Sequence, residues 1–275
     1  MSKQHILLVV VVPTDVADFA SDVLWSAGAQ AVQELALGDH VELVTDLGDH
    51  PLERWASIVA DNALPESWVA RTKIVDADVA DAWRAHATTT RVADINIVPA
   101  WNSSTPGTHD VVIDPGGSFG MGDHPTTRAT LELALGTAGS NALDLGCGSG
   151  VLAIALAKFR GMRCVAVDIA PAAIEAAQMN VALNGVGDVV HVEEGDVRTV
   201  RGTYDIVLAN ILAPVLLSDA ADIALRVASR GTLILSGFMS SRSTDIRAAY
   251  EALGMRYVGV LERDGWIALQ LESIQ

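Results

Sequence analysis

The chain has 275 residues, of which 50% are hydrophobic and 19% charged, a mix typical of globular proteins. This length predicts about two domains. A formal net charge of −16 argues against direct binding to nucleic-acid phosphates, and either favours a basic partner or serves only solubility.

Localisation is indicated by the cysteines and by the first apolar run. Cys147 and Cys164 are the only two cysteines, too few for a disulfide framework, and they suit a reducing compartment. Residues 6–12 (ILLVVVV) are apolar but too few to span a bilayer. Pro13 and two aspartates follow where a signal peptide needs a cleavage site. We therefore expect a strand at 6–12, a cytoplasmic protein and no membrane partner.

The first 75 residues have the pattern of a small α+β domain. Strands are predicted over residues 5–12, 31–35, 41–45 and 68–75, with helices over 16–24 and 51–61. The order β-α-β-β-α-β predicts a ferredoxin-like domain in residues 1–75. Residues 76–110 have a looser pattern, with one strand predicted over 95–101, and are assigned as a linker. The second domain is expected to occupy residues 111–275.

A glycine-rich loop follows a short strand at 111–113 and leads into a helix that starts at Pro125. The first turn of such a helix offers unpaired N–H groups and the hydroxyls of Thr126 and Thr127, which attract a carboxylate or another anion. A plain capped helix after a flexible loop is the alternative. The acids and histidines nearby lack the spacing of metal ligands, so no metal is expected.

The next segment, residues 141–168, reads as strand, glycine turn, buried helix and strand. Asp144 starts a D-x-G-x-G-x-G pattern through Gly146, Gly148 and Gly150, which permits a tight turn close to a ligand. Asp168 ends the second strand, where an acid accepts hydrogen bonds from ribose hydroxyls. The dinucleotide fingerprint requires a small residue at 151, and Val151 argues against a nicotinamide cofactor. The pattern resembles the first motif of class I S-adenosylmethionine methyltransferases.

The remaining elements predict a seven-stranded α/β sheet. Strands are expected over residues 189–193, 204–209, 232–236, 255–261 and 266–271, and helices over 171–184, 215–229 and 245–253. Asp196 follows the third strand, where it either accepts a hydrogen bond from an adenine amino group or is a turn aspartate. Asn210 ends the fourth strand, at the edge where open parallel sheets bind ligands.

Five motifs together, DPGGSFGMGDHPTT, DLGCGSG, AVDIAPAAIEAAQMNVALN, ANILAP and LILSGF, resemble the ribosomal protein methyltransferases of the PrmA type. The resemblance implies a class I methyltransferase (Rossmann-like) domain that uses S-adenosylmethionine and methylates the α-amine and lysine amines of the eleventh large-subunit ribosomal protein. It implies that the N-terminal domain recognises this substrate. Cofactor contacts are expected, on the resemblance and on the motifs above, from Thr127, Gly146, Gly148, Gly150, Asp144, Asp168, Asn210, Phe119 and Asp196. Asn210 is the expected catalytic residue, and a monomer is expected.

The chain departs from the family pattern at two positions. Met121 and Asp123 stand where the family usually has Thr, which bears on substrate identity and on the number of methyl groups added. A related group with similar motifs methylates lysines of an electron-transfer flavoprotein subunit and is the alternative enzyme. A non-catalytic S-adenosylmethionine-binding protein is the third interpretation, although it predicts loss of the Asn210 loop, which this chain retains.

Overall fold

The computed structural model describes residues 4–26, 29, 32–48, 50–62, 64–65, 67–76, 87–102, 107–116 and 118–274. The chain divides into two compact units, Met1–Ala87 and Thr88–Gln275. No helix among the described residues has the length and apolar character needed to cross a bilayer.

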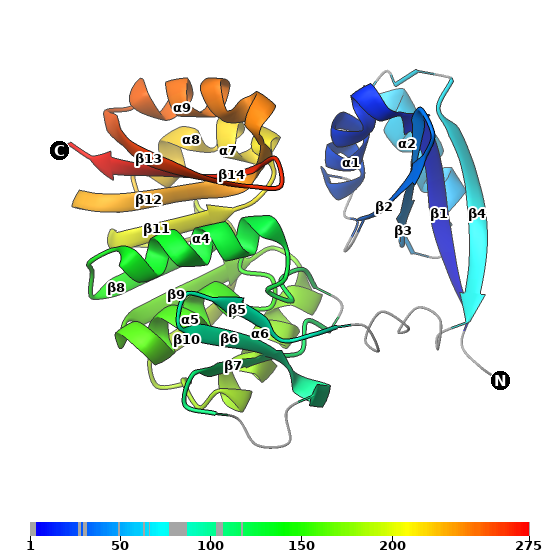
Figure 1. Cartoon of the computed structure of the whole chain (residues 1–275). Helices are drawn as coiled ribbons and strands as arrows, with labels where there is room; N and C mark the ends of the chain where they lie inside the picture. Colours follow the sequence, from blue (N-terminus) through cyan, green and yellow to red (C-terminus); the bar gives the residue numbers. More distant parts are fainter. Residues whose placement is uncertain are drawn as a thin grey trace. The chain divides into compact units, whose positions relative to one another are not determined.

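The N-terminal unit is a four-stranded antiparallel sheet with two helices on one face (Figure 1). Its elements are β1 (Gln4–Pro13), α1 (Ala17–Ser26), β2 (Val32–Leu37), β3 (His40–Thr45), α2 (Pro51–Asn62) and β4 (Val69–Asp76), with sheet order β2-β3-β1-β4. Leu8, Val10 and Val12 alternate along β1 and are buried in one core with Leu24 of α1 and Trp55 of α2. The order confirms the predicted ferredoxin-like fold.

The second unit is built on a seven-stranded sheet of order β10-β9-β8-β11-β12-β14-β13 (Figure 1). Its strands are β8 (Asn141–Leu145), β9 (Arg163–Asp168), β10 (Val190–Glu194), β11 (Tyr204–Asn210), β12 (Val227–Met239), β13 (Met255–Arg263) and β14 (Trp266–Ser273). The first five are parallel, β14 runs antiparallel to β12, and β13, which pairs antiparallel with β14, runs in the same direction as the first five. The predicted α/β sheet is confirmed, and the strand order reverses between β8 and β11.

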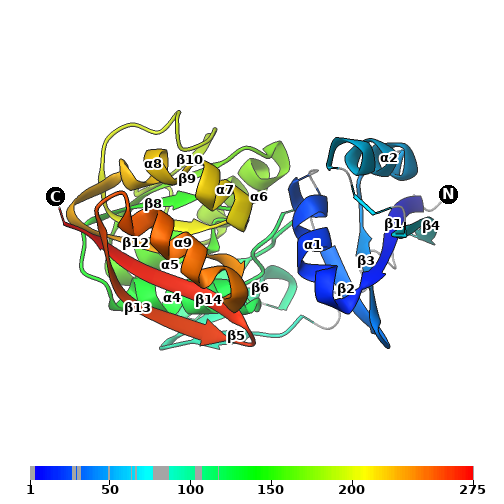
Figure 2. The same cartoon turned by 90° about the horizontal axis from the view of Figure 1, so that it is seen from above.

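Helices cover both faces of this sheet. Along β8, Ala142 packs with α4 (Pro125–Gly136), α5 (Val151–Arg160) and α6 (Pro171–Leu183) in one core. Leu143 and Leu145 point to the other core, formed with α7 (Ala213–Ser218), α8 (Ala220–Ala224) and α9 (Ser243–Glu251). Figure 2 shows α9 over the hairpin, with which it is in contact. Strands buried on both faces explain the nearly continuous apolar runs in the sequence.

A small three-stranded sheet completes the second unit. It contains β5 (Thr90–Val92), β6 (Ile95–Pro99) and β7 (Asp110–Ile113). Five of its apolar residues belong to the core of α4–α6: Val92, Ile95, Ile97, Val111 and Ile113. Much of the segment assigned as a linker, 76–110, is thus packed structure of the second unit. The strand expected over 95–101 stops at Pro99 and continues as a 3-10 turn, Ala100–Asn102. Residues 77–86 lie outside the described residues.

The helix expected over 215–229 is wrong in extent. The chain forms two short helices, α7 and α8, that are interrupted at Asp219, whose φ of −102° and ψ of 11° are not helical. β12 then begins at Val227, well before the predicted strand at 232–236. The side chain of Asp219 is held by Arg198 from another segment, a contact that local periodicity does not reveal.

Candidate active site

Four of the predicted site residues lie in a row along one edge of the large sheet. Leu145 is paired with both Val167 and Ala209, so the next residues, Gly146, Asp168 and Asn210, leave neighbouring strands side by side. Asp168 is paired in turn with Glu194, two residues before Asp196. This is the carboxyl edge of the parallel strands, at the point where strand order reverses, and ligands of open α/β sheets bind there.

The glycine turn between β8 and α5 has a left-handed backbone. Gly146, Gly148 and Gly150 have φ values of +67°, +52° and +79°, which side chains rarely adopt. A Cβ on Gly146 would lie 2.2 Å from Ile211 Cγ2, and one on Gly148 would lie 2.4 Å from the Phe119 carbonyl oxygen. These glycines are therefore required by contacts within the protein as well as by the turn, and not only by the approach of a ligand.

The Asp168 carboxylate is fixed beside this turn. Its Oδ2 accepts a hydrogen bond from the Gly148 N–H at 2.9 Å, and its Oδ1 accepts one from the Ala170 N–H at 3.0 Å. Since each carboxylate oxygen has two lone pairs, both oxygens can accept one more hydrogen bond. The side chain is partly exposed at the sheet edge and suits a pair of ribose hydroxyls.

Asp144 lies beneath the turn and is 1% exposed. Its Oδ2 accepts a hydrogen bond from the Ala153 N–H at 3.2 Å, so it caps the first turn of α5, whose N-cap residue is Gly150. Among the described residues, its Oδ1 has no hydrogen-bond partner. Burial raises the pKa of Asp144 to about 7. The structure thus gives this predicted cofactor contact a role in supporting the turn from below.

The loop after β7 is fastened to the glycine turn through Ser149. The Ser149 N–H donates to the Phe119 carbonyl at 2.8 Å, and its Oγ donates to the Gly120 carbonyl at 2.6 Å. Asn180 of α6 is fully buried, and its Nδ2 donates to the carbonyls of Ser149 and Asp114 at 2.9 and 2.8 Å. Its Oδ1 accepts from the Asp114 N–H at 2.9 Å. Turn, loop and α6 are therefore one hydrogen-bonded unit.

Three aromatic side chains meet where this loop enters α4. His124 is the N-cap residue, and its Nδ1 lies 2.7 Å from Thr126 Oγ1. Its ring makes edge contacts with Phe119 and Trp266, with centroids 5.3 and 4.9 Å apart. Burial lowers the pKa of His124, so the imidazole is neutral at pH 7. Trp266 is paired with Met239 at the end of β12, which brings this cluster to the carboxyl edge.

The first turn of α4 also holds Thr127, one of the predicted cofactor contacts. Its side chain is 1% exposed, and its Oγ1 has no partner among the described residues. Such a buried orphan hydroxyl at a helix N-terminus can be satisfied by a bound ligand. Of the two departures from the family pattern, Met121 packs against the core and Asp123 is exposed to solvent.

The sequence prediction missed several residues that shape this site. Ser149, Asn180 and Arg198 act through contacts with segments far away in the chain, for which no local signal exists. His124 is one of the histidines near Pro125 that lack metal-ligand spacing, although a histidine directly before Pro at a helix start also occupies the N-cap position. In the described part of the chain, no group of three His, Cys, Asp or Glu side chains is placed to hold a metal.

The family model described as "Ribosomal protein L11 methyltransferase (PrmA)" matches residues 53–273. The chain belongs to this family. It is 39% identical over 207 residues to the ribosomal protein L11 methyltransferase of Shouchella clausii, an alignment that covers 72% of this chain and 65% of that relative. It is 33% identical over 240 residues to that of Exiguobacterium sp., covering 85% of this chain and 76% of the relative.

A solved structure supports the same membership. The ribosomal protein L11 methylase from Lactobacillus delbrueckii subsp. bulgaricus is 27% identical, with a TM-score of 0.62, and the match covers 69% of this chain and all of that one. The second unit therefore has the class I S-adenosylmethionine methyltransferase fold, and the N-terminal unit is the ferredoxin-like domain. This PrmA-family chain matches 65% of the length of the first relative, which is less than two thirds.

Proposed function

We propose that this chain is an S-adenosylmethionine-dependent protein N-methyltransferase that methylates α-amino or lysine amino groups of the eleventh protein of the large ribosomal subunit. The observation that carries the proposal is the row of Asp168, Gly146 and Asn210 at the switch point of a PrmA-family sheet. A basic protein substrate fits the formal net charge of −16.

The residues of the site fit this cofactor. Asp168 offers two acceptors for the ribose hydroxyls, and Asp196 offers a carboxylate to the adenine amino group. The amino end of α4, with the orphan Thr127 hydroxyl, suits the carboxylate of the methionine part. When bound, the cofactor supplies a methyl group that its sulfonium has already activated.

Asn210 is proposed as the residue that orients the substrate amine. Only a neutral amine has a free lone pair, and the amide oxygen of Asn210 can accept an N–H bond and direct that lone pair. The neutral imidazole of His124 and the rings of Phe119 and Trp266 add no positive charge that would oppose a cationic side chain's approach. Orientation of this kind accounts for up to roughly 7–11 kcal/mol in favourable cases.

The N-terminal unit is proposed as the substrate-recognition domain of a cytoplasmic, monomeric enzyme that makes no direct contact with nucleic acid. Support comes from its separate core and from a second unit that contains the whole sheet-edge row. Residues 1–75 are proposed as this domain and residues 111–275 as the part that carries the cofactor site. Of the expected connection, residues 76–110, the part from Thr88 onward belongs to the second unit.

The test is mass spectrometry of large-subunit proteins from cells with and without the gene, followed by reconstitution with the purified chain and methyl-labelled cofactor. We expect methyl groups on the eleventh protein to disappear without the gene and to return with the wild-type chain, but not with Asp168→Ala. Identical methylation in both cell types would refute the substrate. Methylation of a different protein would retain the enzyme class and replace the substrate.

A further inference from the structure

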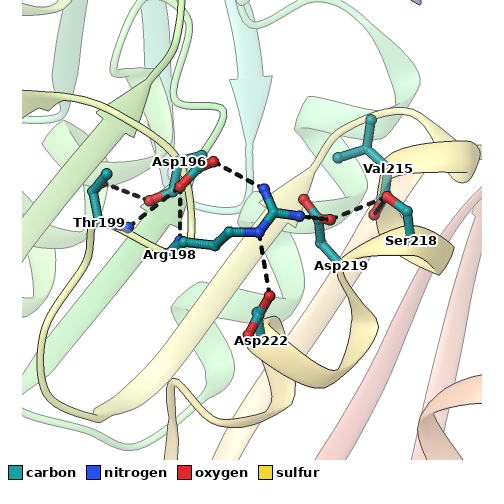
Figure 3. Close-up of polar contacts among 7 residues, drawn as sticks. All are labelled: Asp196, Arg198, Thr199, Val215, Ser218, Asp219 and Asp222. Atoms are coloured by element: carbon teal, nitrogen blue, oxygen red, sulfur yellow. Dashed lines mark hydrogen bonds and ion pairs between the residues drawn. The ribbon is translucent and has the colours of Figure 1, made fainter.

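Arg198 connects two segments that are remote in the sequence, the loop after β10 and the pair of helices α7–α8. It lies in the loop after β10, and its guanidinium is surrounded by three carboxylates, from Asp196, Asp219 and Asp222 (Figure 3). Its Nη1 lies 3.0 Å from Asp196 Oδ2, its Nη2 lies 2.5 Å from Asp219 Oδ1, and its Nε lies 3.5 Å from Asp222 Oδ2. The single Arg198 guanidinium is therefore ion-paired with three carboxylates.

In the first segment, the loop after β10, the Asp196 carboxylate accepts three hydrogen bonds. Its Oδ1 accepts hydrogen bonds from the N–H groups of Arg198 and Thr199, at 2.8 and 3.3 Å, and its Oδ2 accepts from the Arg198 guanidinium. The preceding residue, Gly195, donates its N–H to the backbone carbonyl of Asp168 at 2.9 Å. The plane of the Asp196 carboxylate is thus fixed next to the predicted ribose acceptor.

The second segment, α7–α8, follows Asn210 in the chain. α7 begins three residues after Asn210, and Asp219 stands between α7 and α8. Its carboxylate also accepts a hydrogen bond from Ser218 Oγ at 3.1 Å (Figure 3). Val197 and Val200, on either side of Arg198, are buried in the same core as Leu216 of α7. The loop that carries Asp196 is therefore packed on α7 and ion-paired to its end.

Stability alone is a weak explanation of this arrangement. The Arg198 side chain is 58% exposed, and exposed ion pairs contribute little to folding. Charge-assisted hydrogen bonds, however, fix geometry more strictly than neutral ones do. We propose that Arg198 is a positioning residue that aims the Asp196 carboxylate at the 6-amino group of adenine and ties it to α7–α8, so that the site selects adenine over other purines. This inference rests on the proposed cofactor.

The experiment measures binding of S-adenosylhomocysteine and of S-inosylhomocysteine, which carries a carbonyl oxygen in place of the 6-amino group, by calorimetry. Arg198→Ala should weaken binding of the adenine compound on the order of five- to tenfold, the effect of losing a charge-assisted contact. Binding of the inosine compound should change by less than about twofold, since surface substitutions are otherwise nearly neutral. Discrimination between the two ligands therefore falls.

Arg256→Ala is the matched control. Arg256 is 60% exposed and forms an ion pair with Glu272. Glu272 lies opposite Thr232 of β12, at the end of the strand pairing that is away from the carboxyl edge. This variant should bind both ligands as the wild type does. Asp219→Asn weakens only the α7–α8 side of the tie and should give a smaller loss of discrimination than Arg198→Ala.

Three results would overturn the inference. Unchanged binding of both ligands by Arg198→Ala would show that the guanidinium does not position Asp196. An equal loss for both ligands would show general loosening of the site and not an aimed acceptor. A wild-type chain that binds neither compound would refute the proposed cofactor, and the inference would fall with it.

Discussion

Asp144 is the residue whose replacement tests the electrostatics of the site most directly. Its carboxyl group is buried beneath the glycine turn, with one oxygen bonded to the Ala153 N–H and the other without a partner among the described residues. Burial raises its pKa to about 7 from an ordinary 3.8. We expect Asp144→Asn to keep the bond to Ala153, because an amide oxygen accepts it equally well, and to remove the cost of a buried charge.

The sign and size of the effect follow from proton linkage. Below pH 3.8 the carboxyl is protonated in both states, and there is no cost. Between about pH 4 and about pH 7 the folded state holds a proton that the unfolded state has lost, so the free energy of unfolding falls as the pH rises. The two pKa values differ by about 3, which corresponds to at most ~4 kcal/mol at neutral pH. Asp144→Asn should lack this decline.

The assay is hydrogen exchange of α5 followed by mass spectrometry between pH 4 and pH 8, corrected for intrinsic exchange. Wild-type α5 should lose protection across this range relative to Asp144→Asn. Asp205→Asn is a control that should show no slope in this range, because hydrogen bonds from Ser140 lower the pKa of Asp205, and its contribution to stability is lost only as the pH falls below 3.8. Parallel curves for the wild type and Asp144→Asn would refute the reasoning.

Three further predictions concern the proposed function. Asp168→Ala should weaken S-adenosylmethionine binding by roughly 1.5–3 kcal/mol, the range for a charge-assisted hydrogen bond; unchanged affinity in calorimetry would remove Asp168 from the ribose site. Asn210→Ala should lower kcat and kcat/KM together, and Asn210→Asp should recover turnover better at high pH, where the amine is neutral without help. Normal turnover of Asn210→Ala at saturating cofactor would assign the orienting role elsewhere. A fragment of residues 88–275 should bind cofactor but not methylate the intact ribosomal protein, and full-rate methylation by it would refute recognition by the N-terminal unit.

Regular elements were predictable because their burial follows simple periods. β8 and β11 are buried on both faces and read as continuous apolar runs, and α2 carries Trp55 on the face that enters the core. The sheet edge was predictable for a related reason, since residues that end parallel strands share one edge. Asp168 and Asn210 could therefore be placed in one row without any knowledge of their partners.

The errors have an equally physical origin. Leu216, Leu217, Ala220 and Ile223 continue a helical period through Asp219, so the sequence favours one helix where the structure has two. The interruption coincides with the ion pair from Arg198, a residue 21 positions away. The sequence does not reveal β5, because this strand has only three residues and is recognisable as a strand only by its pairing with β6.

The position of the Phe119 loop illustrates why the site as a whole exceeds its motifs. The loop is rich in glycine and would be pliable alone, yet Ser149 bonds two of its carbonyls and Asn180 holds Ser149 and Asp114. A fully buried asparagine is costly unless its hydrogen bonds are satisfied, and here both Nδ2 hydrogens and Oδ1 are engaged. These hydrogen bonds offset the cost of burial, and they join three segments that no local sequence pattern connects. Because the same hydrogen bonds hold the carbonyls of Phe119 and Gly120 against the glycine turn, the geometry of the proposed site depends on residues that need not touch either ligand.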